Sequence, residues 1–221
     1  MVLMYYKEYL KTRWYLLLLM LTTLGFAGYG LLRMHRVIAL HGVGHVWEVM
    51  LTRDVIFIDL LEFVPLIGGI LLAVVQFAPE MYHKCLKLTL HLPVSHLKVV
   101  NQMLLFGVAA WVIVAVLNFL LIMGYASSLL AAELWSRMVL TALPWYLAGL
   151  AGYLLSAWII LEPAWPRRFF NVVVALLVLK VYFISEQPMA YVGFLPLLCV
   201  YTFLLLSLSW ISICRFKEGK E

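Results

Sequence analysis

Residues 80–103 decide how this chain folds, and they read EMYHKCLKLTLHLPVSHLKVVNQM between two long apolar runs. If residues 80–92 form a helix, four apolar side chains share one stripe and three basic side chains share another. The apolar stripe consists of Met81, Cys85, Leu88 and Leu92, and the basic stripe consists of Lys84, Lys87 and His91. One face of such a helix lies on protein or lipid, and the other faces water. It is therefore either a docking surface for a partner in water or a plain interfacial link between two membrane spans.

The composition is that of an integral membrane protein. Hydrophobic residues make up 66% of the 221 residues, charged residues make up 12%, and the mean hydropathy is +1.02. A helix needs about 20 apolar residues to cross roughly 30 Å of hydrocarbon. Apolar runs near this length lie at residues 14–32, 56–78, 104–123, 139–161, 169–184 and 194–213. The sequence thus predicts an all-α membrane protein in which residues 1–221 form a single domain with six transmembrane helices.

The basic residues predict the orientation of these spans. Lysines and arginines gather before the first run, between the second and third, between the fourth and fifth, and after the sixth. Because cytoplasmic loops carry an excess of Lys and Arg, both termini are predicted to be cytoplasmic. Four arginines form a smaller counter-signal on the opposite side, namely Arg33, Arg36, Arg53 and Arg137. The predicted external connections are residues 33–55, 124–137 and 185–193.

Residues 1–13 have the pattern of an amphipathic helix. The apolar residues of one face are Val2, Leu3, Tyr6 and Leu10, and the charged residues of another are Lys7, Glu8 and Lys11. Helices of this kind lie in the interface between headgroups and acyl chains. We therefore expect residues 1–13 to be a leader helix along the cytoplasmic surface, with a ragged terminus as the alternative.

Three charged residues fall inside the predicted spans. Asp59 and Glu62 lie one to two turns below the outer end of the second span, and Lys180 lies at about the same depth in the fifth. A charged side chain costs about 2.5–3.5 kcal/mol near the centre of a membrane helix, so such groups usually face protein or water. We expect Lys180 to pair with Asp59 or Glu62, within one subunit or across a dimer seam, at the outer end of a polar pathway. In the alternative, each side chain reaches the headgroups independently.

Two histidines are weak candidates for a metal site. His41 and His45 are four residues apart, and His35, Met34 and Met50 lie nearby in the sequence. Imidazole and thioether groups suit soft or borderline metals. A histidine pair without a clear third ligand is more often interfacial, so the sequence assigns no metal to the chain.

Motifs of catalysis are missing from the sequence. It contains no GxxxxGK[ST] phosphate loop, no HExxH and no GxSxG. We therefore expect no enzyme activity and no cofactor in this chain, and any ATP hydrolysis would belong to a separate polypeptide. The three cysteines have no spacing that indicates a disulfide or a zinc site. The net charge of +5 lies mostly at the predicted cytoplasmic ends, where it serves topology and contact with anionic lipid rather than nucleic acid.

The spacing from Glu80 to Leu86-Lys87-Leu88-Thr89-Leu90-His91-Leu92 and Pro93-Val94-Ser95 resembles the first cytoplasmic loop of type-2 ABC transporter permeases. In that exporter family a Glu closes span two, an amphipathic coupling helix follows, and a Leu-Pro-Val-Ser-like turn leads into span three. The family often has a Gly-Thr pair four and five residues after the Glu, where this chain has Lys84 and Cys85. Residues 54–103 carry the match in detail, and the rest agrees in outline.

The resemblance implies a permease subunit in the cytoplasmic (inner) membrane of a prokaryote. Two permease subunits would pair as a homodimer or heterodimer, and each would place its coupling helix, residues 80–96, in a cleft of a cytoplasmic ATPase that binds ATP and Mg. The implied coupling residues are Glu80, Met81, Lys84, Lys87, Leu88 and His91. Glu80, at the junction of span and helix, is expected to hydrogen-bond or ion-pair within the membrane domain. The alternatives are a non-transporting membrane anchor or assembly subunit and, less expected, a metal-handling membrane protein.

Overall fold

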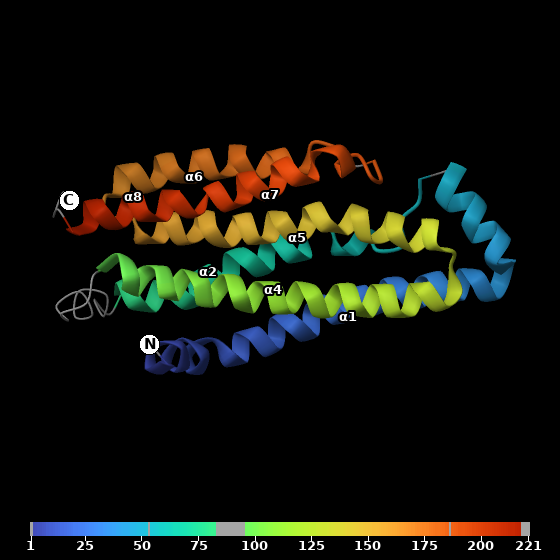
Figure 1. Ribbon diagram of the computed structural model, residues 1–221, viewed down its shortest axis with the longest axis horizontal. Helices are drawn as coiled ribbons and strands as arrows, with labels where there is room; N and C mark the ends of the chain where they lie inside the picture. The colour runs from blue at the N-terminus through green and yellow to red at the C-terminus, as the bar shows by residue number, and fades with distance from the viewer. Residues whose placement is uncertain (1, 53, 83–95, 186, 218–221) are drawn as a thin grey trace.

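The computed structural model describes residues 2–52, 54–82, 96–185 and 187–217, and these residues form helices and short connections without any strand (Figure 1). The α-helices are α1 (Val2–Thr52), α2 (Val64–Tyr82), α4 (His96–Leu129), α5 (Ala132–Leu161), α6 (Trp165–Lys180), α7 (Leu195–Leu204) and α8 (Leu206–Lys217). The short 3-10 helices are η1 (Asp59–Leu61), η2 (Val181–Phe183) and η3 (Val192–Phe194). The long helices run side by side in an elongated bundle. The prediction of an all-α chain is confirmed for the described residues.

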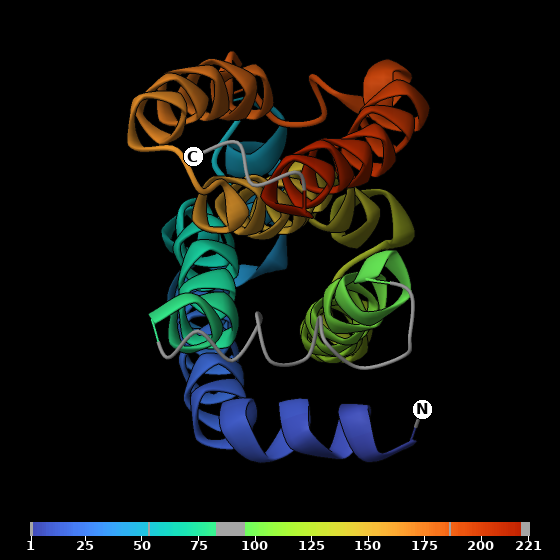
Figure 2. The ribbon, with the colours of Figure 1, turned by 90° about the vertical axis from the view of Figure 1, so that its left-hand side faces the viewer.

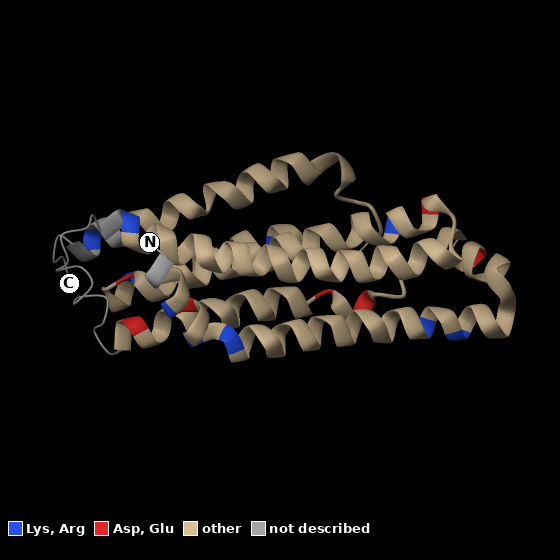
Figure 3. Ribbon diagram, turned by 60° about the horizontal axis from the view of Figure 1, so that its bottom comes forward, with Lys and Arg blue, Asp and Glu red and all other residues tan. Residues whose placement is uncertain are grey.

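Five helical segments of the described chain are long and apolar enough to cross a membrane. They are Met4–Thr52, Asp59–Tyr82, Lys98–Leu129, Ala132–Leu161 and Val192–Ser212. They contain the first, third and fourth predicted spans and nearly all of the second and the sixth. Most of the charged residues lie towards the two ends of the bundle, as a membrane-embedded protein requires (Figure 3).

The start of α1 and the end of α8 lie at the same end of the bundle, together with the end of α2 and the start of α6 (Figure 1). We call this the basal end and the opposite one the distal end. The first turns of α1 run across the basal end, whereas the rest of α1 runs along the bundle (Figure 2). This crosswise placement is the one expected of an interfacial leader helix.

Most of residues 33–55, which are predicted to form an external connection, are helical. Helix α1 continues to Thr52 and is interrupted by a kink at Gly42, whose φ of 81° and ψ of 166° are not helical. Only glycine adopts this conformation without steric cost, so the chain turns there without unwinding for long. Residue Arg33 therefore lies on a rigid helix beside the start of α2.

Helices α2 and α5 pack backbone to backbone at the centre of the bundle. A Cβ atom on Gly69 would lie 1.9 Å from the carbonyl oxygen of Gly149. A Cβ atom on Gly149 would lie 2.2 Å from the ring of Trp111 and 2.6 Å from the carbonyl oxygen of Pro65. Small residues give membrane helices this close approach. The small residues of the fourth predicted span thus serve packing within the chain.

We predict that Gly69→Ala destabilises the folded protein by about 1–3 kcal/mol or more. The methyl group of the alanine would overlap backbone atoms of α5 that cannot move aside. The matched control is Gly124→Ala in α4, where nothing lies within 4 Å of the added carbon. Thermal melting in detergent, followed by size-exclusion chromatography, measures both variants. Equal melting temperatures would contradict the close α2–α5 contact.

A sixth crossing stays a prediction, and it depends on α6. The residues predicted as the fifth span fall in α6, which has 16 residues, and in the three residues of η2. At 1.5 Å and 2.0 Å per residue these reach about 30 Å, the thickness of the hydrocarbon. In a cysteine-free background, we expect Gln187→Cys to be labelled from the same side of the membrane as Gly44→Cys, and Trp165→Cys from the other. Labelling of Trp165→Cys and Gln187→Cys from one side would reduce the count to five.

Candidate functional site

A cluster of four charged residues joins the leader part of α1 to the last turn of α2 at the basal end. The Nζ atoms of Lys7 and Lys11 lie 2.8 Å and 3.1 Å from Oε1 of Glu80. Lys11 also lies 3.0 Å from Oε2 of Glu8, one turn earlier in α1. We call Lys7, Glu8, Lys11 and Glu80 the basal ion cluster. The expected ion pairing of Glu80 is confirmed.

Both carboxylates of the basal ion cluster are buried. Glu8 is 1% exposed and Glu80 is 4% exposed, whereas the side chain of Lys7 remains 47% exposed. A buried charge is tolerated only with a partner of opposite sign, because its desolvation is costly. Two lysines and two glutamates give no net charge. The pairing therefore fixes the leader against α2 and leaves Lys11 as the bridge between the two acids.

A buried hydrogen-bond network continues from this cluster into the bundle. Gln76 lies one turn before Glu80 on the same face of α2 and has no exposed surface. Its Nε2 donates to the carbonyl oxygen of Met103 in α4 at 2.8 Å, and its Oε1 accepts from the hydroxyl of Tyr153 in α5 at 2.8 Å. These hydrogen bonds connect α2 to both α4 and α5. Helices α2 and α4 are the two that flank residues 83–95 in the sequence.

Of the six predicted coupling residues, only Glu80 and Met81 belong to the part of the chain that the structure describes. Met81 is half-buried and packs against the core. Lys84, Lys87, Leu88 and His91 lie outside the described residues. The amphipathic pattern of residues 1–13 pointed to the leader helix, but it carried no signal that Lys7 and Lys11 would meet Glu80.

Sequence reasoning missed a third buried carboxylate at the basal end. Glu162 ends α5, has no exposed surface and accepts a hydrogen bond from the hydroxyl of Ser212 in α8. The guanidinium groups of Arg167 and Arg215 lie 3.9 Å and 3.8 Å from it. In the sequence, Arg167 and Arg215 contribute only to the predicted orientation of the spans, as basic residues between the fourth and fifth runs and after the sixth. In the fold they neutralise an acid that ties together α5, α6 and α8.

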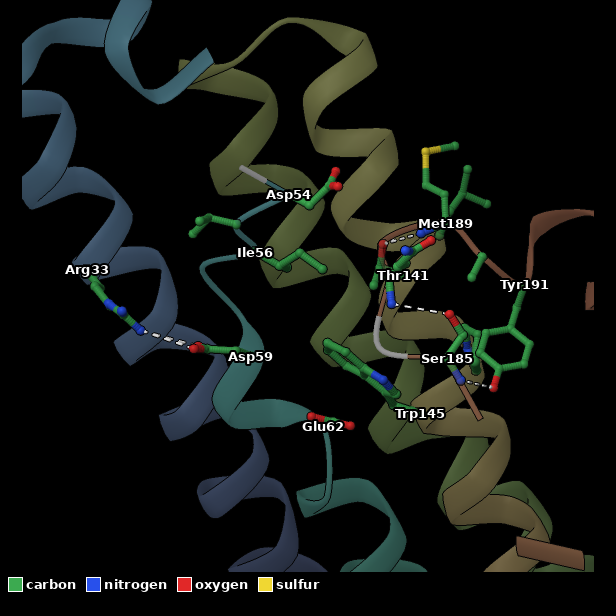
Figure 4. A pocket seen from close by; sticks show the side chains of 15 residues that line it. Arg33, Asp54, Ile56, Asp59, Glu62, Thr141, Trp145, Ser185, Met189 and Tyr191 are labelled. Atoms are coloured by element: carbon green, nitrogen blue, oxygen red, sulfur yellow. Dashed lines mark hydrogen bonds and ion pairs between the residues drawn. The ribbon is translucent and has the colours of Figure 1, made fainter. Parts of the chain in front are cut away.

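A cavity of about 390 Å³ lies towards the distal end, where the chain passes from α1 to α2 (Figure 4). Its wall comes from Arg33 of α1, from residues 54–56, 59 and 62, from α5, and from residues 185, 187 and 189–191. Asp59 and Glu62, the two predicted pathway carboxylates, both line it. Thr141 of α5 closes one side, where its hydroxyl accepts a hydrogen bond from the backbone N–H of Met189 at 3.2 Å.

The cavity's charges are arranged differently from the prediction. Asp59 pairs with Arg33 of α1 at 3.3 Å, and Asp54 pairs with Arg137 of α5. Lys180 is exposed at the end of α6, and none of the ion pairs between described residues includes it. The expected pair of Lys180 with Asp59 or Glu62 is therefore not formed within the described chain, because helical α1 carries Arg33 to Asp59. A pair across a dimer seam stays a prediction.

The two candidate metal residues stand together without further ligands around them. The rings of His41 and His45 stack with centroids 5.0 Å apart, and both residues are exposed. Within residues 2–52, 54–82, 96–185 and 187–217, no group of three or more His, Cys, Asp or Glu side chains is placed to hold a metal ion. The geometry thus gives these histidines no role in a described metal centre.

Comparison with known proteins yields no relative. No protein-family model, no curated protein and no solved structure matches this chain. The functional assignment therefore rests on the geometry of the two ends of the bundle and on the resemblance of residues 80–95.

We predict that Lys11→Met destabilises the protein by about 3–5 kcal/mol, because it leaves the buried carboxylate of Glu8 without a cation and Glu80 with only the half-exposed Lys7. Lys7→Met is the matched control on the same helix. Since the Lys7 side chain is half exposed, its loss should cost no more than about 1 kcal/mol. Unfolding in mixed detergent and denaturant micelles measures both variants. Similar losses for the two lysines would contradict the bridging role of Lys11.

Proposed function

We propose that this chain is the membrane-spanning permease subunit of an ATP-driven exporter of the type-2 ABC family. It would work with a second permease subunit and with a separate cytoplasmic ATPase that binds ATP and Mg. The observation that carries the proposal is Glu80, a buried carboxylate in the last turn of α2, directly before the segment that resembles a coupling helix. In this proposal the basal end faces the cytoplasm and α6 with η2 supplies the sixth crossing.

The basal ion cluster supplies a route by which force could enter the membrane domain. Closure of the ATPase dimer would displace residues 80–96 at the basal end. Because Glu80 is paired with two lysines of the leader, the displacement would move α1 together with α2. The hydrogen bond from Gln76 to Met103 would pass the same displacement to α4. Such a rigid-body motion is a two-state switch that ATP biases by binding one state better.

The distal cavity would form the outer end of the export path. Non-helical backbone at membrane depth is tolerated where it lines a cavity, and residues 54–58 between α1 and η1 are of this kind. The ion pair of Arg33 with Asp59 is half exposed, so it holds this wall weakly. This pair would therefore resist a change in the shape of the wall only weakly when the basal end moves.

The test is a purification of the tagged chain from its native membranes in mild detergent, with identification of every associated chain. We expect an ABC ATPase to co-purify with the wild type. The double reversal Lys84→Glu with Lys87→Glu should reduce its recovery about tenfold or more, since opposed charges disrupt a docked face. The matched control reverses Lys217 and Lys220, which carry the same charges in the C-terminal tail. Glu80→Gln should keep the ATPase but lose the coupling of ATP hydrolysis to transport in proteoliposomes.

Two results would overturn the proposal. Absence of any ATPase from the wild-type preparation, with a different membrane complex in its place, would favour the anchor or assembly subunit. Full recovery of the ATPase with the Lys84 and Lys87 reversal would remove the coupling role of residues 80–96.

A further inference from the structure

We propose that a groove between α1 and α4 binds an anionic phospholipid of the basal leaflet, with the headgroup at Arg13 and one acyl chain along the groove. The groove has a volume of about 380 Å³ and is lined by five residues from each helix. Arg13 is the only charged residue among them, and the hydroxyl of Tyr9 is the only other polar side-chain group. The rest of the lining is apolar. This inference does not depend on the proposed transport function.

Arg13 is a cation that the described part of the protein leaves without a carboxylate. Lys7 and Lys11 on the same helix are already paired with glutamates in the basal ion cluster. Arg13 is exposed, its guanidinium stands 5.5 Å from the centre of the Trp14 ring, and none of the ion pairs between described residues includes it. Arginine binds phosphate through several donors at once, and aromatic residues mark the headgroup level.

The groove has the length and direction of an acyl chain. From Arg13 to Met20 along α1 the rise is about 10 Å, and from Phe106 to Val114 along α4 it is about 12 Å. One leaflet of the hydrocarbon core is about 15 Å deep. The rings of Tyr5 and Phe106 lie 6.5 Å apart, which places the leader beside the basal end of the groove. A lipid with its phosphate at Arg13 would therefore lay most of one chain between the helices.

Charge favours a lipid over a second copy of the chain as the occupant. A second copy would need an acidic side chain to meet Arg13. The described carboxylates of the basal end are Glu8, Glu80 and Glu162, and each is buried and paired within its own chain. A free phosphate ion would leave the apolar lining uncovered. An anionic phospholipid satisfies both the charge and the apolar surface.

The experiment uses the purified full-length chain in detergent, stripped of lipid and then equilibrated with phosphatidylglycerol or phosphatidylcholine of the same chain length. Native mass spectrometry counts the lipids that remain bound. We expect one retained phosphatidylglycerol, a preference of about tenfold over phosphatidylcholine, and loss of that preference in Arg13→Gln. Ala110→Phe should lower retention of both lipids because it fills the groove. Lys98→Gln, which removes an exposed cation outside the groove lining, should behave as the wild type.

Phosphatidylglycerol with a photoreactive group in one acyl chain locates the site directly. Crosslinks on residues 14–20 and 106–114 that disappear in Arg13→Gln support the proposal. Crosslinks spread evenly over the apolar surface, or equal retention of the two lipids by wild type and Arg13→Gln, would overturn it. Disulfide formation between two copies carrying Ile113→Cys, with lipid excluded, would show that a second chain fills the groove instead. Size-exclusion chromatography of each variant confirms that it is folded.

Discussion

The fold of the basal end depends on one constraint, which is that a carboxylate buried in an apolar protein needs a cation beside it. Glu80 and Glu8 are both almost inaccessible, and Lys11 lies within 3.1 Å of each of them. Apolar contact alone cannot specify where the leader lies, because lipid tails solvate its apolar face as well as protein does. The ion pairs of Lys7 and Lys11 with Glu80 determine where the leader lies. Moving the leader away from α2 would leave the buried carboxylate of Glu80 uncompensated, at a cost of several kcal/mol.

The same solution appears a second time at the junction of α5 and α6. Glu162 is neutralised by arginines on both sides of it, one from α6 and one from α8. The N-terminal segment is therefore anchored by the buried acids of the basal ion cluster and the C-terminal segment by Glu162. The distal end is built differently, since the carboxylates of its two ion pairs, Asp59 with Arg33 and Asp54 with Arg137, are both more than half exposed and such pairs contribute little. The bundle thus has one end fixed by buried charge and one end held loosely.

Sequence periodicity and hydropathy were enough to predict the helices, since five of the six predicted spans lie in segments that can cross a membrane. Hydropathy was not enough for helical segments rich in polar residues or for contacts between charged side chains. Residues 33–52 contain arginines and histidines that lower hydropathy without preventing a helix, so hydropathy gave no signal that α1 continues to Thr52. Arg33 was therefore not identified as the partner of Asp59, which it meets from this continued helix. Glu162 was missed because its partners come from sequence positions 5 and 53 residues later and their approach depends on how α6 and α8 pack.

Buried polar contacts connect the helices in two groups that meet at α5. Gln76 joins α2 to α4 and α5, and Asn118 of α4 donates to the hydroxyl of Thr23 in α1 at 3.0 Å. Helices α6, α7 and α8 form a separate layer on the far side of α5 (Figure 2), where Tyr182 and Thr202 share a hydrogen bond of their own. Polar contacts of this kind are directional, so helices that share them move together more readily than helices joined by apolar packing. In the proposed exporter, a displacement that begins between α2 and α4 would therefore reach α1 and α5 first and arrive at the outer layer through α5 and Glu162.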